Sequence, residues 1–315
     1  MATPQAASAI GGGTALAGVL GDPVRHSLSP AMHNAAIAAL GLDWAYLALP
    51  VAAADLAVVL RGLEAIDCRG LNVTLPHKQA AAGLADELTP LARRLGAVNT
   101  LARRDGGGWL GANTDVEGFL APLRSPGAAA DAGGDPWGER EALVLGCGGS
   151  ARAVVAGLVE LGLGRIRVAG RDRTHLDGFV SSCAGWAPGL EPLVWGPGEA
   201  GRPDPLAGAL AGADLVVNTT PLGMASGRDP AAAARSPLDP AQVALLRPAA
   251  TIYDLIYTPR PTTLLRQAGE RGCRTIDGLE MLVQQGAASL RLWCGQRDVP
   301  VSAMREAALA RLGDP

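Results

Sequence analysis

A lysine and an aspartate each lie where a predicted helix opens, and both residue types can exchange a proton. Lys78 ends the stretch Gly-Leu-Asn-Val-Thr-Leu-Pro-His-Lys, in which a short apolar strand stops at Pro76 and a helix should open with His77 and Lys78. Asp115 opens a later predicted helix. A positioned lysine or carboxylate can transfer a proton, and an ammonium can stabilise an oxyanion. Taken alone, Lys78 would be a surface residue on a turn and Asp115 a helix cap.

Two serines precede another predicted helix, over residues 31–40, in the block Ser27-Leu28-Ser29-Pro30. Pro30 suits the first helical turn, so Ser29 is expected to be the N-cap of this helix. Ser27 has no such structural explanation. It is therefore a candidate for binding a ligand.

A glycine-rich turn indicates a nucleotide site. Gly146-Cys147-Gly148-Gly149-Ser150-Ala151 fits the pattern G-x-G-x-x-A between a predicted strand at 142–145 and a helix at 151–161, and another strand follows at 166–169. This strand–turn–helix–strand context is what makes the pattern specific for a dinucleotide. Its glycines let the backbone approach a pyrophosphate, which binds to the free N–H groups at the helix start.

The end of the next strand indicates which dinucleotide binds. An NAD site usually has an acidic residue there, whereas an arginine accommodates a 2′-phosphate. The chain reads Gly170-Arg171-Asp172-Arg173-Thr174, so Arg171 and Arg173 favour NADP over NAD. Asp172 could instead cap the helix that begins near Thr174.

The predicted elements that position these residues form two α/β domains. Strands at 15–20, 44–51 and 70–75 alternate with helices in the amino-terminal part, as in a parallel sheet, and Leu71, Val73 and Leu75 should face its core. The glycine turn begins a second such series, with later strands at 215–217 and 250–255. Two helices close the chain, the last with Ser302 as its expected N-cap. The carboxyl ends of both sheets should flank a cleft, because ligands of α/β sheets bind there.

Composition excludes several classes of protein. The 315 residues carry a net charge of -3, which leaves no electrostatic footprint for nucleic acid. Five scattered cysteines without a C-x-x-C pair argue against a disulfide framework and a zinc site, and favour a reducing cytoplasm. No run of 18 apolar residues and no signal peptide is evident, so neither a membrane span nor secretion is expected. Residues 1–14 are expected to be a flexible lead-in.

The ordered motifs together resemble the shikimate dehydrogenase family, the NADP-dependent enzymes that reduce 3-dehydroshikimate in chorismate and aromatic amino acid biosynthesis. The resemblance runs from Gly18 to Gly295. It implies a discontinuous substrate-binding catalytic domain, residues 15–113 plus 278–315, and a Rossmann-type NADP-binding domain, residues 114–277. It rests on the two-serine block with His33-Asn34, Asn72 to Lys78, Gly96 to Thr100, Gly111 to Asp115, the glycine turn, Asn218 to Met224, Asp254 to Pro259 and Gly278 to Gly286.

The resemblance also assigns roles residue by residue. Lys78 and Asp115 would be catalytic, and whether one of them or the coupled pair exchanges the proton stays open. No metal is implied. The substrate-binding residues would be Ser27, Ser29, Thr74, Asn99, Asp115, Tyr257 and Gln285. The cofactor-binding residues would be Gly146, Cys147, Gly148, Gly149, Ser150, Arg171, Thr220, Leu255 and Gly278.

The chain departs from the family pattern in two ways. The family often has Asn-Arg-Thr where this chain has Gly170-Arg171-Asp172-Arg173-Thr174, and insertions near Ser125 and Ala225 lengthen it. Two alternatives stay open. One is a quinate/shikimate or aminoshikimate dehydrogenase using NAD or NADP, and the other is a non-catalytic ligand-binding relative. The expected partner is a small-molecule substrate, with the protein a monomer or homodimer.

Overall fold

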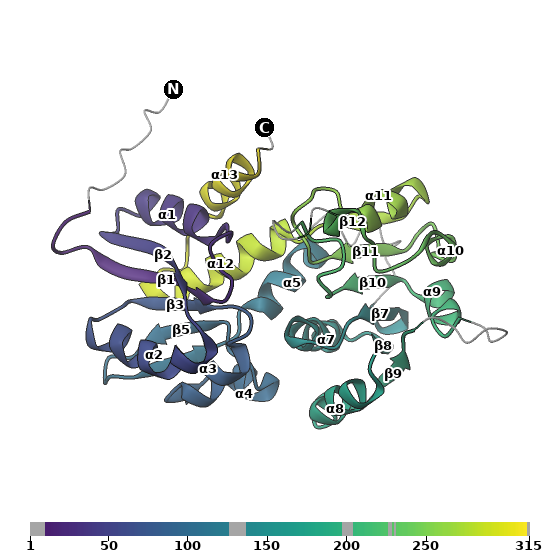
Figure 1. The fold of residues 1–315 in the computed structure, drawn as a ribbon, viewed down its shortest axis with the longest axis horizontal. Helices are drawn as coiled ribbons and strands as arrows, with labels where there is room; N and C mark the ends of the chain where they lie inside the picture. Colours follow the sequence, from purple (N-terminus) through teal and green to yellow (C-terminus); the bar gives the residue numbers. More distant parts are fainter. Residues whose placement is uncertain (1–9, 126–136, 197–203, 226–228, 230, 314–315) are drawn as a thin grey trace. The chain divides into compact units, whose positions relative to one another are not determined.

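A computed structural model describes residues 10–125, 137–196, 204–225, 229 and 231–313. The insertions predicted near Ser125 and Ala225, and most of the predicted lead-in, fall largely outside these ranges. The chain divides into two compact units, one of residues 1–118 with 282–315 and the other of residues 119–281. Each is an α/β unit built on a six-stranded sheet (Figure 1).

The sheet of the first unit is mixed. Its parallel part joins β1 to β2 and β3, and β5 then runs antiparallel to both β3 and β6. The predicted parallel arrangement is confirmed for β1, β2 and β3, but the sheet as a whole is not parallel, because β5 and β6 are joined by a tight turn, which only antiparallel neighbours allow. The strand order is β2 (Trp44–Pro50), β1 (Ala15–Gly21), β3 (Gly70–Val73), β5 (Thr100–Arg103), β6 (Trp109–Ala112) and β4 (Glu87–Leu88).

The helices of this unit begin close to the predicted positions, but two capping predictions are wrong. Ser29 is the first residue of α1, whose N-cap position is Leu28 and makes no side-chain cap. Ser302 is the second residue of α13. Leu75 is also not in the core: β3 ends at Val73, and a turn leaves Leu75 65% exposed. The helices are α1 (Ser29–Ala39), α2 (Leu56–Ala65), α3 (Lys78–Leu84), α4 (Pro90–Leu95) and α13 (Val301–Leu312), with a 3₁₀ turn, η1 (Ala53–Asp55). Two further helices, α5 (Asp115–Arg124) and α12 (Leu279–Cys294), belong partly to this unit and partly to the second.

The sheet of the second unit is wholly parallel. Its order is β12-β11-β10-β7-β8-β9, so the strands, numbered within the unit, follow the sequence 3-2-1-4-5-6 from the β9 edge. This is the Rossmann order, with its switch point between β7 and β10. The strands are β7 (Glu141–Leu145), β8 (Arg165–Gly170), β9 (Leu190–Val194), β10 (Leu215–Asn218), β11 (Thr251–Asp254) and β12 (Arg274–Ile276).

Helices connect these strands in the manner of a doubly wound fold. The two-domain α/β prediction is confirmed, with one mixed and one parallel sheet. Among the described residues, no helix is both long and apolar enough to cross a bilayer. The helices are α7 (Gly149–Leu161), α8 (Arg173–Cys183), α9 (Ala207–Gly212), α10 (Pro240–Val243) and α11 (Thr263–Glu270), with 3₁₀ turns η2 (Trp137–Glu139) and η3 (Ala232–Ala234).

A glycine before α12 is required by close backbone packing, and this can be tested. A Cβ at Gly278 would collide with the backbone of Leu255, whereas a Cβ at Gly208 in α9 would meet no atom within 4 Å. Gly278→Ala should therefore lower the free energy of unfolding by about 1 to 3 kcal/mol. Gly208→Ala should leave it unchanged or raise it by up to about 1 kcal/mol. Urea unfolding measures both, and equal stabilities of the two variants would contradict the packing argument.

Candidate active site

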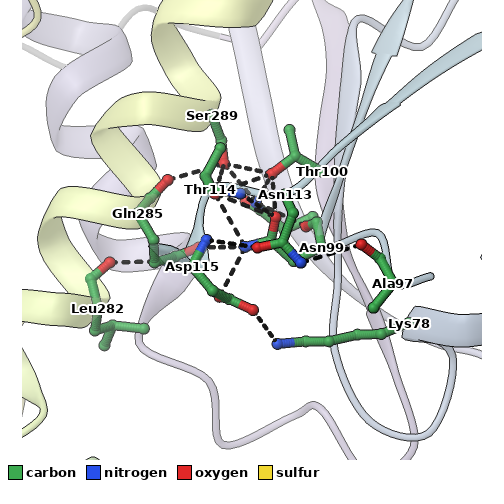
Figure 2. A network of polar contacts seen from close by, with 11 residues as sticks. Lys78, Ala97, Asn99, Thr100, Asn113, Thr114, Asp115, Leu282, Gln285 and Ser289 are labelled. Atoms are coloured by element: carbon green, nitrogen blue, oxygen red, sulfur yellow. Dashed lines mark hydrogen bonds and ion pairs between the residues drawn. The ribbon is translucent and has the colours of Figure 1, made fainter. Parts of the chain in front are cut away.

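Lys78 and Asp115 form a buried ion pair in the first unit. The Lys78 Nζ lies 2.6 Å from the Asp115 Oδ2, and the two side chains are only 14% and 9% exposed. Lys78 is the first residue of α3 and follows β3, whereas Asp115 is the first residue of α5 and follows β6. Figure 2 shows the two side chains pointing toward one another. Buried charges of opposite sign need this proximity, because either charge alone would be costly to bury.

The carboxylate of Asp115 is not a helix cap. The side chain of Asn113 accepts the Asp115 backbone N–H at 3.1 Å, which leaves both carboxylate oxygens for other groups. Asn99 donates to the second oxygen, Oδ1, at 2.8 Å. Asp115 is therefore held from two sides, by an ammonium and by an amide.

Asn99 is oriented by its neighbours as well as by Asp115. Its Oδ1 accepts the Thr114 backbone N–H at 2.8 Å, so its Nδ2 faces Asp115 and the Thr114 hydroxyl, which is 2.9 Å away. The Gln285 Oε1 lies 3.4 Å from the same Nδ2 (Figure 2). The structure thus brings Lys78, Asp115, Asn99 and Gln285 together, as a common site requires.

The sequence reasoning missed the polar residues beneath this site. Asn72, Thr100, Thr114 and Ser289 are buried and hydrogen-bonded in one network that continues to Asn99. A signal was present for most of them, because they are polar residues at the ends of apolar strands. Ser289 had a weaker one, its position one turn after Gln285 on α12.

Ser27, Ser29 and Thr74 lie at the carboxyl ends of β1 and β3, which are parallel neighbours. The Ser27 hydroxyl accepts the backbone N–H of Ser29 at 3.2 Å, so Ser27 has a local structural contact that the sequence analysis did not give it. A Cβ at Gly21 would collide with Thr74, which shows how closely the two strand ends approach.

A buried histidine lies beneath Ser29. The His33 ring stacks on Tyr46 with ring centroids 4.1 Å apart, and its Nδ1 lies 2.9 Å from the Ser29 carbonyl oxygen. Burial lowers the pKa of His33 to about 4, so the ring is neutral at neutral pH. A neutral ring can donate from Nδ1 to the Ser29 carbonyl and thereby hold that serine in place.

The glycine turn lies at the switch point of the second unit. Gly146 has a φ of +104°, which favours glycine, and a Cβ there would come within 2.7 Å of Thr219 and 2.9 Å of Thr220 after β10. Gly148 and Gly149 face open space, and α7 starts at Gly149. An open glycine surface at a helix N-terminus fits the pyrophosphate of a dinucleotide.

The three charged residues after β8, Arg171, Asp172 and Arg173, make different contacts. Asp172 caps α8, because its Oδ1 accepts the His175 backbone N–H at 2.6 Å, and this prediction is confirmed. Arg173 is held by Asp177, with its Nε 2.8 and 3.0 Å from the two carboxylate oxygens. Arg171 makes no hydrogen bond or ion pair within the described part of the chain. It lines a cavity of about 490 Å³ with Trp195 and Gln267. Of the two arginines, Arg171 is therefore the one available for a phosphate.

A buried aspartate joins the loops that follow β10 and β11. Asp254 accepts hydrogen bonds from Asn218, the Ile256 backbone and Thr262, at 2.9, 3.2 and 2.8 Å. Burial raises the pKa of Asp254 to about 6. Asn218 in turn accepts from the Thr220 backbone and hydroxyl at 3.0 and 2.7 Å.

Leu255 and Tyr257 follow β11, and Gly278 follows β12. Gly278 packs directly against Leu255 and donates its backbone N–H to the Ile256 carbonyl at 3.1 Å. Tyr257 belongs to this second unit, unlike the other predicted substrate-binding residues. Burial raises the pKa of Tyr257, so its hydroxyl is a neutral donor.

Comparison with known proteins places these features in a family. A family model for the shikimate dehydrogenase substrate binding domain matches residues 19–101, and one for the shikimate 5′-dehydrogenase C-terminal domain matches residues 278–309. The shikimate dehydrogenase (NADP(+)) of Synechocystis sp. is 48% identical over 308 residues, which cover 96% of this chain and 98% of the relative. The chain belongs to the shikimate dehydrogenase family.

Solved structures agree with this membership. Shikimate 5-dehydrogenase from Thermus thermophilus, in complex with NADP(H) and shikimate, has a TM-score of 0.76 and 36% identity, covering 95% of this chain and 100% of that one. The enzyme from Listeria monocytogenes, in complex with shikimate and NAD, has a TM-score of 0.80 and 31% identity, covering 95% and 98%. The family resemblance stated from the sequence is confirmed.

Within the described residues, no group of three or more His, Cys, Asp or Glu side chains is arranged to hold a metal ion.

The raised pKa of Asp254 predicts a pH-dependent stability. An aspartate with a folded pKa of about 6, above its ordinary 3.8, binds an extra proton in the folded state between those pH values. The contribution of Asp254 to the free energy of unfolding is complete below about pH 4. It is lost as the pH rises through about 6, and the loss amounts to about 1 to 3 kcal/mol. Asp254→Asn, which cannot ionise, should lack this loss. Urea unfolding of both proteins from pH 4 to 7.5 measures it.

The exposed Asp105 in a surface turn offers a matched control. Asp105→Asn should follow the wild-type dependence on pH. A constant stability difference between wild type and Asp254→Asn over this pH range would contradict the assignment.

Proposed function

We propose that this chain is a shikimate dehydrogenase that catalyses the reversible NADPH-dependent reduction of 3-dehydroshikimate to shikimate, a reaction of chorismate biosynthesis. The observation that carries the proposal is the buried Lys78–Asp115 pair, 2.6 Å apart and braced by Asn99, in a chain of this family. The pair offers a proton and a fixed positive charge in one place. A ketone reduction needs both at the carbonyl oxygen.

The composition of the chain strengthens the role of Lys78. Of its 27 lysines and arginines, Lys78 is the only lysine. An arginine stays protonated in proteins and cannot give up its proton, whereas a lysine amine can. A chain that otherwise has arginine at every lysine or arginine position thus has its one lysine amine beside Asp115. This placement supports proton exchange at Lys78.

The chemistry can be divided between cofactor and protein. When bound, NADPH would supply the hydride of the reduction. The Lys78 ammonium stabilises the oxygen as negative charge develops on it, and the Lys78–Asp115 pair delivers the proton as a coupled unit. In the reverse direction the same pair removes the proton of the hydroxyl. Asp115 also holds Lys78 in the site and accepts a hydrogen bond from a hydroxyl of the substrate.

Specificity comes from polar groups that go unpaired with the wrong ligand, at about 1 to 3 kcal/mol for each buried group. We assign the substrate carboxylate to Ser27, Ser29 and Tyr257, and the ring hydroxyls to Asn99, Asp115 and Gln285. Thr74 is the remaining proposed substrate-binding residue. In this proposal residues 15–113 with 278–315 bind substrate and residues 114–277 bind the dinucleotide.

The cofactor proposed is NADP, bound by the glycine turn and by the strand ends beside it. Its residues are Gly146, Cys147, Gly148, Gly149, Ser150, Arg171, Thr220, Leu255 and Gly278. Arg171 supports a 2′-phosphate, and Asp172 is engaged in the cap of α8 and does not serve the ribose hydroxyls. We place the enzyme in the cytoplasm as a monomer or homodimer. Initial rates with shikimate and quinate, each with NADP and NAD, separate this activity from that of a quinate/shikimate dehydrogenase.

Replacement of Lys78 tests the catalytic pair. Lys78→Ala should lower kcat for shikimate oxidation by at least about 100-fold, because the proton-transfer group is lost. NADP binding, measured by calorimetry, should stay nearly unchanged. Lys78→Arg keeps a charge but cannot release a proton, so it should not restore kcat. Arg297→Ala, at an exposed position, provides the control. Near-normal turnover of folded Lys78→Ala would refute the mechanism.

Replacement of Arg171 tests the cofactor preference. Arg171→Ala should raise the KM for NADP by about 10- to 100-fold, because a charge-assisted hydrogen bond to a phosphate is lost, and should leave the KM for NAD nearly constant. Arg173→Ala is the matched control, since the structure pairs this residue with Asp177. Equal losses for NADP and NAD, or a larger effect at Arg173, would count against the assignment.

A further inference from the structure

Ser289 joins α12 to the strands beneath the active site. Its hydroxyl, fully buried, lies 2.8 Å from the Asn72 Nδ2, 2.8 Å from the Thr100 hydroxyl and 3.0 Å from the Gln285 carbonyl oxygen. The Thr114 hydroxyl follows at 3.2 Å. Figure 2 shows Ser289 pointing from α12 toward Thr100 and Thr114. One hydroxyl therefore touches residues of β3, β5, α12 and the segment before α5.

The chemistry of these partners gives the network a direction. The Asn72 amide nitrogen can only donate, and the Gln285 carbonyl can only accept. Ser289 has one hydrogen, so when it donates to Gln285 it must accept from both Asn72 and Thr100. The single hydrogen of Thr100 then points to Ser289 and away from the Asn99 Oδ1, which is 3.0 Å from the Thr100 hydroxyl.

The same donor-to-acceptor order continues from Thr100 through the Thr114 hydroxyl to Asn99. With the Thr100 hydrogen directed to Ser289, the Thr114 hydroxyl can donate to Thr100 at 3.2 Å and accept from the Asn99 Nδ2 at 2.9 Å. The other Nδ2 hydrogen goes to Asp115, and the Asn99 Oδ1 keeps the Thr114 backbone N–H. Every donor in this series has an acceptor, and the series ends at the Asn99 amide, which the Thr114 backbone N–H and the Asp115 carboxylate orient.

We propose that Ser289 is a positioning residue for the active site, which holds the Thr100 and Thr114 hydroxyls in place behind Asn99 and so keeps Asn99 against Asp115. The proposal rests on the proposed function, in which Asn99 and Gln285 bind ring hydroxyls of the substrate. Ser289 touches no substrate in this account. It acts through Thr100, Thr114 and the turn of α12 that carries Gln285.

Kinetics and one spectroscopic signal test the proposal. Ser289→Ala removes the hydroxyl that contacts Thr100 and Thr114, and it leaves the Asn72 amide with only longer contacts, at 3.3 and 3.4 Å, so Asn99 is held less firmly against Asp115. The KM for shikimate should rise about tenfold and kcat should fall less than about threefold, because Asn99 binds substrate and does not transfer the proton. Since Lys78 is the only lysine, protein labelled with ¹⁵N at lysine Nζ gives a single ammonium resonance, which should shift in the variant.

A second variant tests the same series of hydrogen bonds between Ser289 and Asn99. Thr100→Val removes the hydroxyl between Ser289 and Asn99 at nearly constant volume, and it should reproduce the KM effect. The double variant should be no worse than either single one, because all three interrupt one series of hydrogen bonds. Ile37→Val, a buried substitution in α1, controls for a general loss of stability and should leave both the KM and the Lys78 resonance unchanged.

The measurements distinguish a failure of this proposal from a failure of the proposed function. Wild-type KM and an unshifted Lys78 resonance in folded Ser289→Ala would overturn the proposal, as would additive effects of Ser289→Ala and Thr100→Val. If the wild-type protein oxidised no shikimate, the proposed function would fail, while the resonance, which needs no substrate, would still decide whether Ser289 acts on the Lys78–Asp115 pair.

Discussion

The buried ion pair of Lys78 and Asp115 is the interaction on which the first unit depends. An unpaired charge at either position would be strongly destabilising, so the ends of β3 and β6 must be held at one fixed separation. The surrounding amides and hydroxyls meet this need. Asn99 occupies the second carboxylate oxygen, and Asn113 takes the capping task that would otherwise compete for Asp115. The same arrangement that makes burial tolerable keeps an ammonium and a carboxylate ready for a reacting oxygen.

The second unit depends on a different constraint, the close approach of backbone to backbone. Gly146 comes so near to Thr219 and Thr220 that a side chain would not fit, and Gly278 packs against Leu255 in the same way. Asp254 adds a polar anchor between the loops after β10 and β11. These contacts leave the start of α7 open, as a pyrophosphate requires. The candidate site of the first unit is thus built from a buried polar network. The candidate site of the second unit is built from glycines, which leave the backbone open.

Local signals in the sequence predicted the elements well where one physical cause dominated. The glycine turn, its flanking strands and the helix at Lys78 follow from backbone freedom and from the properties of proline. Predictions failed where tertiary contacts decided. Ser29 had the sequence of an N-cap, yet its N–H is taken by Ser27 and its carbonyl by His33. Leu75 fitted the alternation of a strand, but the chain turns away after Val73.

The sequence by itself determined the family, the two α/β domains and the identity of most polar residues at strand ends, because these depend on residue type and on spacing along the chain. Only the tertiary structure decided which polar groups meet. It joined Asp115 to Lys78 across 37 residues, and Ser289 to Asn72 across 217. It also separated Arg171, which lines a cavity, from Arg173, which is bound to Asp177. The physical reason is that a hydrogen bond depends on distance and direction in space, and neither is encoded in local sequence periodicity.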